Sequence, residues 1–191
     1  GILNSHWRTA LLACDTSEDM QAVLEEAVGG ARTRKPRQGK GALACLQWHS
    51  IGLNLTGRNR EAIIDQLLAL CARTGAMTNT EEVRQALLAR EHKSSTGMEH
   101  GVALPHARTE AVDRMVCAMG ISREGVDFGA MDDQPSHLFF MVLVPPDAAG
   151  DYARLTARIT RALDEDGRRE IMQATSINQV MAVLERGKPS R

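Results

Sequence analysis

Aromatic residues are scarce in this chain of 191 residues, at 3% of the total. A hydrophobic core must therefore consist mainly of Leu, Val, Ile, Met and Ala, and an apolar fraction of 43% is sufficient to build one. The formal net charge is only -1, so no charge excess indicates a membrane surface or direct binding of nucleic acid. No apolar run approaches the roughly 18 residues of a membrane-spanning helix, and no secretory signal peptide is visible.

The four cysteines are widely spaced and include no Cys-x-x-Cys pair: Cys14, Cys45, Cys71 and Cys117. Three of them have mostly apolar neighbours. Widely spaced cysteines with apolar neighbours are typical of reduced core residues in a cytoplasmic protein, where disulfides are rare. We therefore expect a cytoplasmic protein, or the cytoplasmic part of a membrane-associated one.

A metal site would have to use the histidines and glutamates between residues 91 and 106. The spacings of eight and six residues between His92, His100 and His106 do not match a ligand pair on one helix. Two of these histidines also lie in charged, loop-like surroundings. We expect neither a metal nor another cofactor.

Residues 1–50 differ from the rest of the chain. The run "TSEDMQAVLEEAVGG" predicts a short helix that Gly29 and Gly30 end. The basic run "ARTRKPRQGKG" that follows is typical of a linker, either a solvated tether or a surface for an anionic partner such as phospholipid. The first residue is Gly1 rather than Met, which leaves open that the chain is part of a longer protein. We predict an N-terminal helical extension with a basic linker over 1–50.

Residues 51–191 alternate between strand and helix patterns. Strands are predicted at 51–55, 101–106, 114–122 and 136–146, and helices at 59–75, 79–92, 150–166 and 176–187. The continuously apolar run from Leu138 to Val144 indicates a strand buried on both faces. The mixture predicts an α/β domain over 51–191, with a central sheet covered on both sides.

The segment "STGMEHGVALPHARTE" contains the main candidate for chemistry, His106. Pro105 stiffens the backbone before it, at the predicted C-terminal end of a strand, where ligand sites of open α/β sheets lie. Hydroxyl and basic side chains nearby are suited to binding a dianionic phosphoryl group: Arg90, Ser95, Thr96 and Arg108. From these features alone, a structural His106 that only caps a carbonyl remains an alternative.

The runs "LLAREHKSSTGMEHGVALPHAR" and "GVDFGAMDDQPSHLFFMVLVPP" together resemble the type-2 EIIA domains of the bacterial phosphotransferase system, which include fructose-, mannitol- and nitrogen-type members. The resemblance covers about 51–187 and does not extend to 1–50. It implies a mixed sheet of about five strands with helices on both faces. It also implies that His106 is phosphorylated by HPr or its nitrogen-branch equivalent, and that the group passes to an EIIB domain or serves as a regulatory mark.

The same resemblance assigns roles to neighbouring residues. Arg90 matches the arginine that faces the phosphate, and Ser95 or Thr96 is a weaker candidate for a hydroxyl donor or for orienting the ring. The chain departs from the family at Tyr152, where a second histidine is usual. Tyrosine donates a hydrogen bond but cannot become cationic, so phosphate stabilisation is expected to be weaker or to shift to Arg90, Arg108 and backbone groups.

A second hypothesis keeps the fold and changes the role. The unmatched first 50 residues, the basic linker and Tyr152 are also compatible with a regulatory or sensory module fused to a membrane transporter or a transcription regulator, with weak or no phosphotransfer. Apolar residues of the extension, such as Leu11, Leu12 and Val23, can pack on the main domain or on a second copy, so a homodimer is also open.

Overall fold

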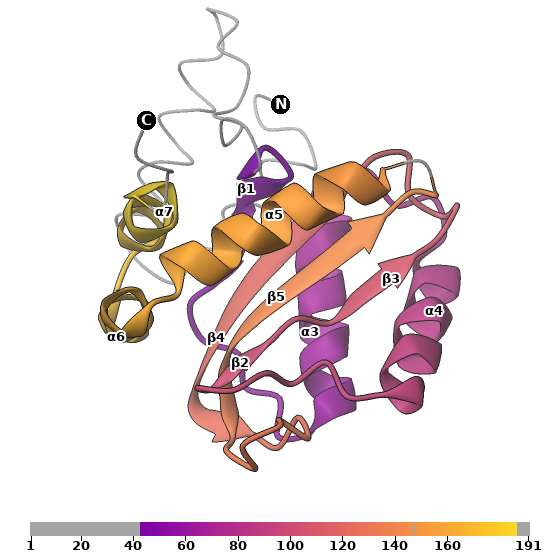
Figure 1. Cartoon of the computed structure of the whole chain (residues 1–191). Helices are drawn as coiled ribbons and strands as arrows, with labels where there is room; N and C mark the ends of the chain where they lie inside the picture. Colours follow the sequence, from indigo (N-terminus) through magenta and orange to yellow (C-terminus); the bar gives the residue numbers. More distant parts are fainter. Residues whose placement is uncertain (1–42, 147, 187–191) are drawn as a thin grey trace, which may run out of the picture.

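The computed structural model describes residues 43–146 and 148–186 (Figure 1). The predicted helix near the N-terminus, the basic linker and Cys14 lie outside these ranges. In chain order the elements are β1 Leu46–Gly52, α3 Arg60–Ala72, α4 Thr80–Lys93, β2 Val102–Ala103, β3 His106–Arg108, β4 Val116–Val126, β5 Ser136–Val144, α5 Ala149–Ala162, α6 Glu165–Gln173 and α7 Ile177–Arg186.

The strands form one mixed sheet in the order β1-β4-β5-β2, and β3 continues beside β5 where β2 has ended. β4 runs antiparallel to β5, whereas β1 is parallel to β4 and both β2 and β3 are parallel to β5. The expected α/β fold with a mixed five-stranded sheet is therefore confirmed.

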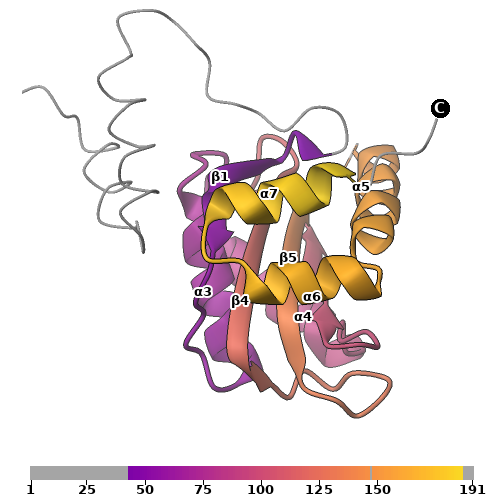
Figure 2. The same cartoon turned by 90° about the vertical axis from the view of Figure 1, so that its left-hand side faces the viewer.

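Helices cover both faces of the sheet, with α3 and α4 on one side and α5, α6 and α7 on the other (Figures 1 and 2). The central strand β5 supplies side chains to both cores. Phe139 and Met141 pack with α3 and α4, while Leu138 and Phe140 pack with α5, α6 and α7. This alternation explains the continuous apolar run, because each successive side chain points to the opposite face.

Asparagine side chains cap the N-termini of α3 and α4. The side chain of Asn59 accepts a hydrogen bond from the backbone of Ala62, and that of Asn79 accepts one from the backbone of Glu82. The helix predicted over 150–166 was wrong in extent. It ends at Ala162, and Asp164 caps the separate helix α6.

Two predicted strands differ from the observed ones. The first was expected at 51–55, but β1 begins at Leu46. The strand expected over 101–106 is divided into β2 and β3, because Pro105 has no N–H group to continue the ladder. His106 therefore begins the edge strand β3 instead of ending a strand, which corrects its predicted position. The division of the chain at residue 50 stays a prediction.

Candidate functional site

His106 lies opposite Val142 in the register of β3 and β5. Figure 1 shows β3 between β5 and α4, with α5 crossing the same region of the sheet. Ala107 belongs to the core under α3 and α4. Because side chains alternate along a strand, those of His106 and Arg108 point to the face covered by α5. The imidazole is half-buried at an open edge of the sheet.

The hydrogen bonds of His106 assign its tautomer. Nδ1 lies 2.9 Å from the carbonyl oxygen of Leu104, which can only accept, so Nδ1 carries the proton. Nε2 then has a free lone pair, and it accepts a hydrogen bond from Nε of Arg90 at 3.2 Å. The arrangement presents a neutral imidazole whose outer nitrogen is unprotonated and lies beside a permanent positive charge.

Arg90 reaches His106 from the last turn of α4. Its Nη1 also donates to the carbonyl oxygen of Ser94 at 2.8 Å, so two of its three nitrogens are held. Because β3 is at the edge of the sheet, a residue of α4 can meet a side chain that points to the opposite face.

Tyr152, in the first turns of α5, completes the group around the imidazole. The ring centroids of Tyr152 and His106 are 5.3 Å apart, with an angle of 38° between the ring planes. Burial raises the pKa of Tyr152 above its ordinary value of 10.0, and the charge of Arg90 offsets part of this effect. The phenol is therefore a neutral hydrogen-bond donor near pH 7. The residue at which the resemblance led us to expect a second histidine therefore lies beside His106 in space.

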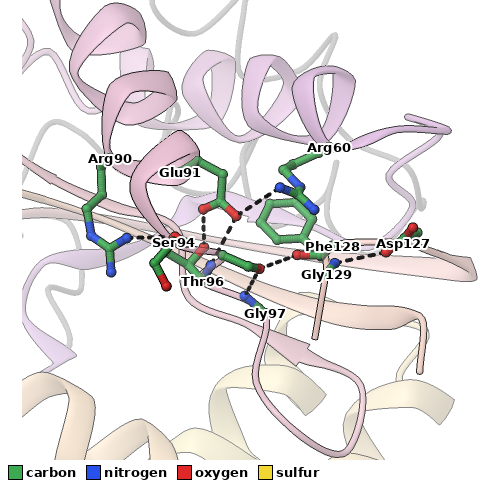
Figure 3. A network of polar contacts seen from close by, with 10 residues as sticks. Arg60, Arg90, Glu91, Ser94, Thr96, Gly97, Asp127, Phe128 and Gly129 are labelled. Atoms are coloured by element: carbon green, nitrogen blue, oxygen red, sulfur yellow. Dashed lines mark hydrogen bonds and ion pairs between the residues drawn. The ribbon is translucent and has the colours of Figure 1, made fainter. Parts of the chain in front are cut away.

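The two predicted hydroxyl residues take part in a separate network, shown in Figure 3. The Thr96 hydroxyl donates to Glu91 at 2.5 Å, and the Thr96 amide donates to the same carboxylate at 3.0 Å. The Ser95 hydroxyl donates to the carbonyl oxygen of Phe128 and accepts from the amide of Gly97. Both hydroxyl protons are thus donated to protein acceptors. A direct contact of Ser95 or Thr96 with phosphate stays a prediction.

Arg108 is exposed on β3 and shares the face of His106. Its side chain makes no hydrogen bond or ion pair with any residue in the described ranges. Of the six predicted site residues, the structure therefore brings His106, Arg90 and Tyr152 into one group. Arg108 stands beside that group with its charge free for a partner or ligand.

Glu91 is a residue whose role the sequence reasoning missed. Its side chain is 3% exposed and contacts Thr96 and Arg60, the latter at 3.7 Å. The sequence contains one signal for this role, because Glu91 falls in the last turn of the helix predicted over 79–92. The helix dipole disfavours negative charge there, so the carboxylate needs a compensating partner.

The described residues support neither a metal-binding site nor a membrane-spanning helix. No three His, Cys, Asp or Glu side chains there are grouped closely enough to hold a metal ion. None of the helices in those ranges combines the length and the apolar character needed to cross a bilayer.

The chain is similar to known proteins in sequence and in structure. The family model described as "Phosphoenolpyruvate-dependent sugar phosphotransferase system, EIIA 2" matches residues 45–187. A fructose-specific EIIA component from Haloferax volcanii is 37% identical over 135 residues, which is 70% of this chain and 88% of the relative. The crystal structure of nitrogen regulatory protein IIA-Ntr from Neisseria meningitidis is 30% identical, with a TM-score of 0.68 over 73% of this chain and 96% of the other.

A further relative is much longer. The fructose-specific EIIABC component of Bacillus subtilis is 31% identical over 140 residues, which is 73% of this chain but only 22% of the relative's length. The matched region is thus also found as one part of a larger polypeptide.

Proposed function

The chain belongs to the EIIA type-2 family of the phosphoenolpyruvate-dependent sugar phosphotransferase system, and we propose that it is a phosphocarrier that uses Nε2 of His106. The donor is the phosphohistidine of HPr or of a nitrogen-branch HPr-like protein. The acceptor is an EIIB domain, or the phosphoryl group remains as a mark read by a regulatory target. These exchanges take place in the cytoplasm and need no cofactor.

The observation that carries the proposal is the fixed tautomer of His106. The Leu104 carbonyl holds the proton on Nδ1, so the lone pair of Nε2 points out of the ring toward the site of Arg90. A neutral imidazole nitrogen is a competent nucleophile near pH 7, and no general base has to remove a proton first.

The transfer step balances without another reactant. The lone pair of Nε2 forms a bond to phosphorus, and the bond between phosphorus and the donor histidine breaks with its electron pair returning to the donor ring. The His106 ring becomes cationic, and the Leu104 carbonyl stabilises the Nδ1–H group that keeps its proton. The reverse sequence passes the group to the next acceptor.

Arg90 must change partners during this step. Its Nε donates to the lone pair that attacks phosphorus, so this hydrogen bond is lost as the new bond forms. The guanidinium can then donate to the phosphoryl oxygens, which a planar group with several N–H donors suits well. Tyr152 is a second donor to the phosphoryl group, and exposed Arg108 adds positive charge on the same face.

A second role has its own supporting observation. The match to a region that makes up 22% of the Bacillus subtilis relative favours a domain that works within a larger transporter polypeptide. In that case the domain is a fused EIIA or a regulatory module with weak transfer. The complete reading frame of the gene decides whether membrane spans or a DNA-binding domain accompany this segment.

The test of the first role is a phosphorylation assay. The protein is incubated with phosphoenolpyruvate, Enzyme I and HPr, and intact-mass spectrometry follows the gain of one phosphoryl group. His106→Ala should abolish the gain, while His100→Ala, a change of an exposed histidine six residues away, should keep it. No gain with either HPr or its nitrogen-branch equivalent, or a gain that survives His106→Ala, rejects the carrier role.

A further inference from the structure

We propose that Glu91 and Thr96 are positioning residues for phosphotransfer, which fix the direction of Arg90 through the segment 94–97. This inference rests on the proposed function of His106. Neither residue is placed in contact with the imidazole or the phosphoryl group. They act through the hydrogen bond that Ser94 makes with Arg90.

Glu91 is a buried carboxylate in an unfavourable place. It lies in the last turn of α4, at the negative end of the helix dipole, and its side chain is 3% exposed. A buried charge persists only when it is paired and hydrogen-bonded. Here Thr96 supplies its amide and its hydroxyl, and Arg60 supplies a positive charge at 3.7 Å. The contacts join the end of α4 to the segment that follows it.

Residues around Phe128 also hold the segment 94–97 in place. The Ser95 hydroxyl donates to the Phe128 carbonyl oxygen. The guanidinium carbon of Arg60 lies 5.5 Å from the centre of the Phe128 ring, so one arginine contacts both anchors. A Cβ atom on Gly97 would lie 2.8 Å from backbone atoms of Ala130, which shows how closely the two segments approach. Figure 3 shows Arg60 between the Glu91 carboxylate and the Phe128 ring.

The anchored segment determines where the Ser94 carbonyl points. Ser94 leaves the helix with an extended backbone, at φ -169° and ψ 137°, and its carbonyl oxygen accepts from Nη1 of Arg90 at 2.8 Å. Because the guanidinium is planar and rigid, holding Nη1 also fixes the direction of Nε. Nε then points at Nε2 of His106. The remaining nitrogen, Nη2, makes no hydrogen bond with any described residue and is available to a phosphoryl oxygen.

The first experiment measures the rate at which HPr phosphorylates His106 in matched variants. Thr96→Val removes one donor to Glu91 at nearly constant volume, and Thr96→Ser keeps it. We expect a fall of about tenfold for Thr96→Val and for Glu91→Gln, because a small misplacement of a charged group lowers a transfer rate strongly. Thr96→Ser should restore the rate to within about threefold of the wild type. Glu99→Gln, at an exposed glutamate, is the control.

A double-mutant cycle separates positioning from a general loss of stability. If Glu91 and Thr96 act through Arg90, the Thr96→Val effect disappears in an Arg90→Ala background, because no guanidinium remains to be directed. An effect of the same size in both backgrounds overturns the proposal. All rates are measured well below the melting temperature of each variant.

A second readout requires no phosphotransfer partner. Nitrogen-15 spectra of the His106 ring should show a protonated Nδ1 and an Nε2 that accepts a hydrogen bond. Thr96→Val and Glu91→Gln should move the Nε2 signal toward its position in Arg90→Ala, with Nδ1 still protonated. Unchanged Nε2 signals in folded variants overturn the positioning role. A wild type that shows these signals but accepts no phosphoryl group overturns the carrier function instead.

Discussion

Nε of Arg90 lies 3.2 Å from Nε2 of His106, and the Leu104 carbonyl holds the opposite ring nitrogen. The nitrogen that would react is therefore covered by the cation that would later stabilise the product. This relationship holds the ring in one orientation, with Nδ1 toward the Leu104 carbonyl and Nε2 toward Arg90. In the proposed transfer, Arg90 must move away from Nε2 before phosphorus can bond there. The position of Arg90 should therefore affect the transfer rate.

Substitution of Arg90 should lower the rate more than the affinity for the donor protein. We expect a loss of about a hundredfold for Arg90→Gln and about tenfold for Arg90→Lys, because lysine keeps the charge but loses the planar fork. Initial rates at several HPr concentrations separate the maximal rate from the half-saturating concentration. Arg169→Gln, at an exposed arginine of α6, is the matched control. Equal losses in the maximal rate for Arg90→Gln and Arg169→Gln would contradict a specific role.

The close approach of Gly97 to Ala130 predicts a stability effect. In Gly97→Ala the new Cβ would lie 2.8 Å from the Cα and N atoms of Ala130, so one backbone segment must move. Strain of this kind costs about 1–3 kcal/mol. Gly52→Ala is the comparison, because its Cβ would meet only the flexible ends of the Leu70 and Leu55 side chains, at 3.1 and 3.3 Å. Urea denaturation should show the larger loss of unfolding free energy for Gly97→Ala, and the reverse order would show that the segments separate easily.

Much of the fold was predictable because local chemistry and tertiary packing agree. Asn59 and Asn79 begin helices where their side chains can accept from the first turn. The apolar run of β5 needed a core on both faces and has one. The start of β1 was missed because Gln47 and Trp48 are only partly buried at the edge of the sheet, so no strand periodicity marks them.

The candidate site was predictable where a residue's role depends on its own chemistry. Pro105 and His106 are adjacent, and their combination indicates a fixed imidazole without knowledge of the fold. The partners of Ser95 and Thr96 were not predictable, because a hydroxyl donates to whichever acceptor the tertiary structure places near it. Here those acceptors are the Phe128 carbonyl and the Glu91 carboxylate.

The buried cysteines should react slowly in the folded protein. Burial, together with the nearby Cys45, raises the pKa of Cys71 above its ordinary value of 9.0, and a side-chain hydrogen bond with Cys45 and burial raise that of Cys117. The thiolate is the reactive form. In a Cys14→Ser background we expect alkylation of Cys71 and Cys117 to be at least about a hundredfold slower in buffer than in urea. Fast labelling under native conditions would show that the sheet opens locally near β1.

Tyr152 is the single tyrosine of the chain, so its phenol can be titrated by absorbance without a competing signal. The midpoint should lie above 10.0 in the folded protein and return to the ordinary value in urea, because burial raises the pKa. Removing the opposing charge in Arg90→Gln should raise it further. A midpoint at or below 10.0 in the folded protein would mean that the ring is not buried beside His106.

The sign of this shift also determines the effect of pH on stability and function. Above pH 10 the folded protein keeps a proton that the unfolded chain has lost, so the unfolding free energy falls as pH rises. Tyr152→Phe should remove this part of the decrease.

Near pH 7 the phenol is a neutral donor, and Tyr152→Phe should shorten the lifetime of phosphorylated His106 by about three- to tenfold at every pH between 6 and 8, as expected for one lost hydrogen bond. Tyr152→His should instead give faster or more stable phosphorylation, with the gain growing below about pH 6.5 as the new imidazole becomes cationic. If neither substitution changes the lifetime, the hydroxyl of Tyr152 does not contact the phosphoryl group, and Arg90 and Arg108 carry its charge alone.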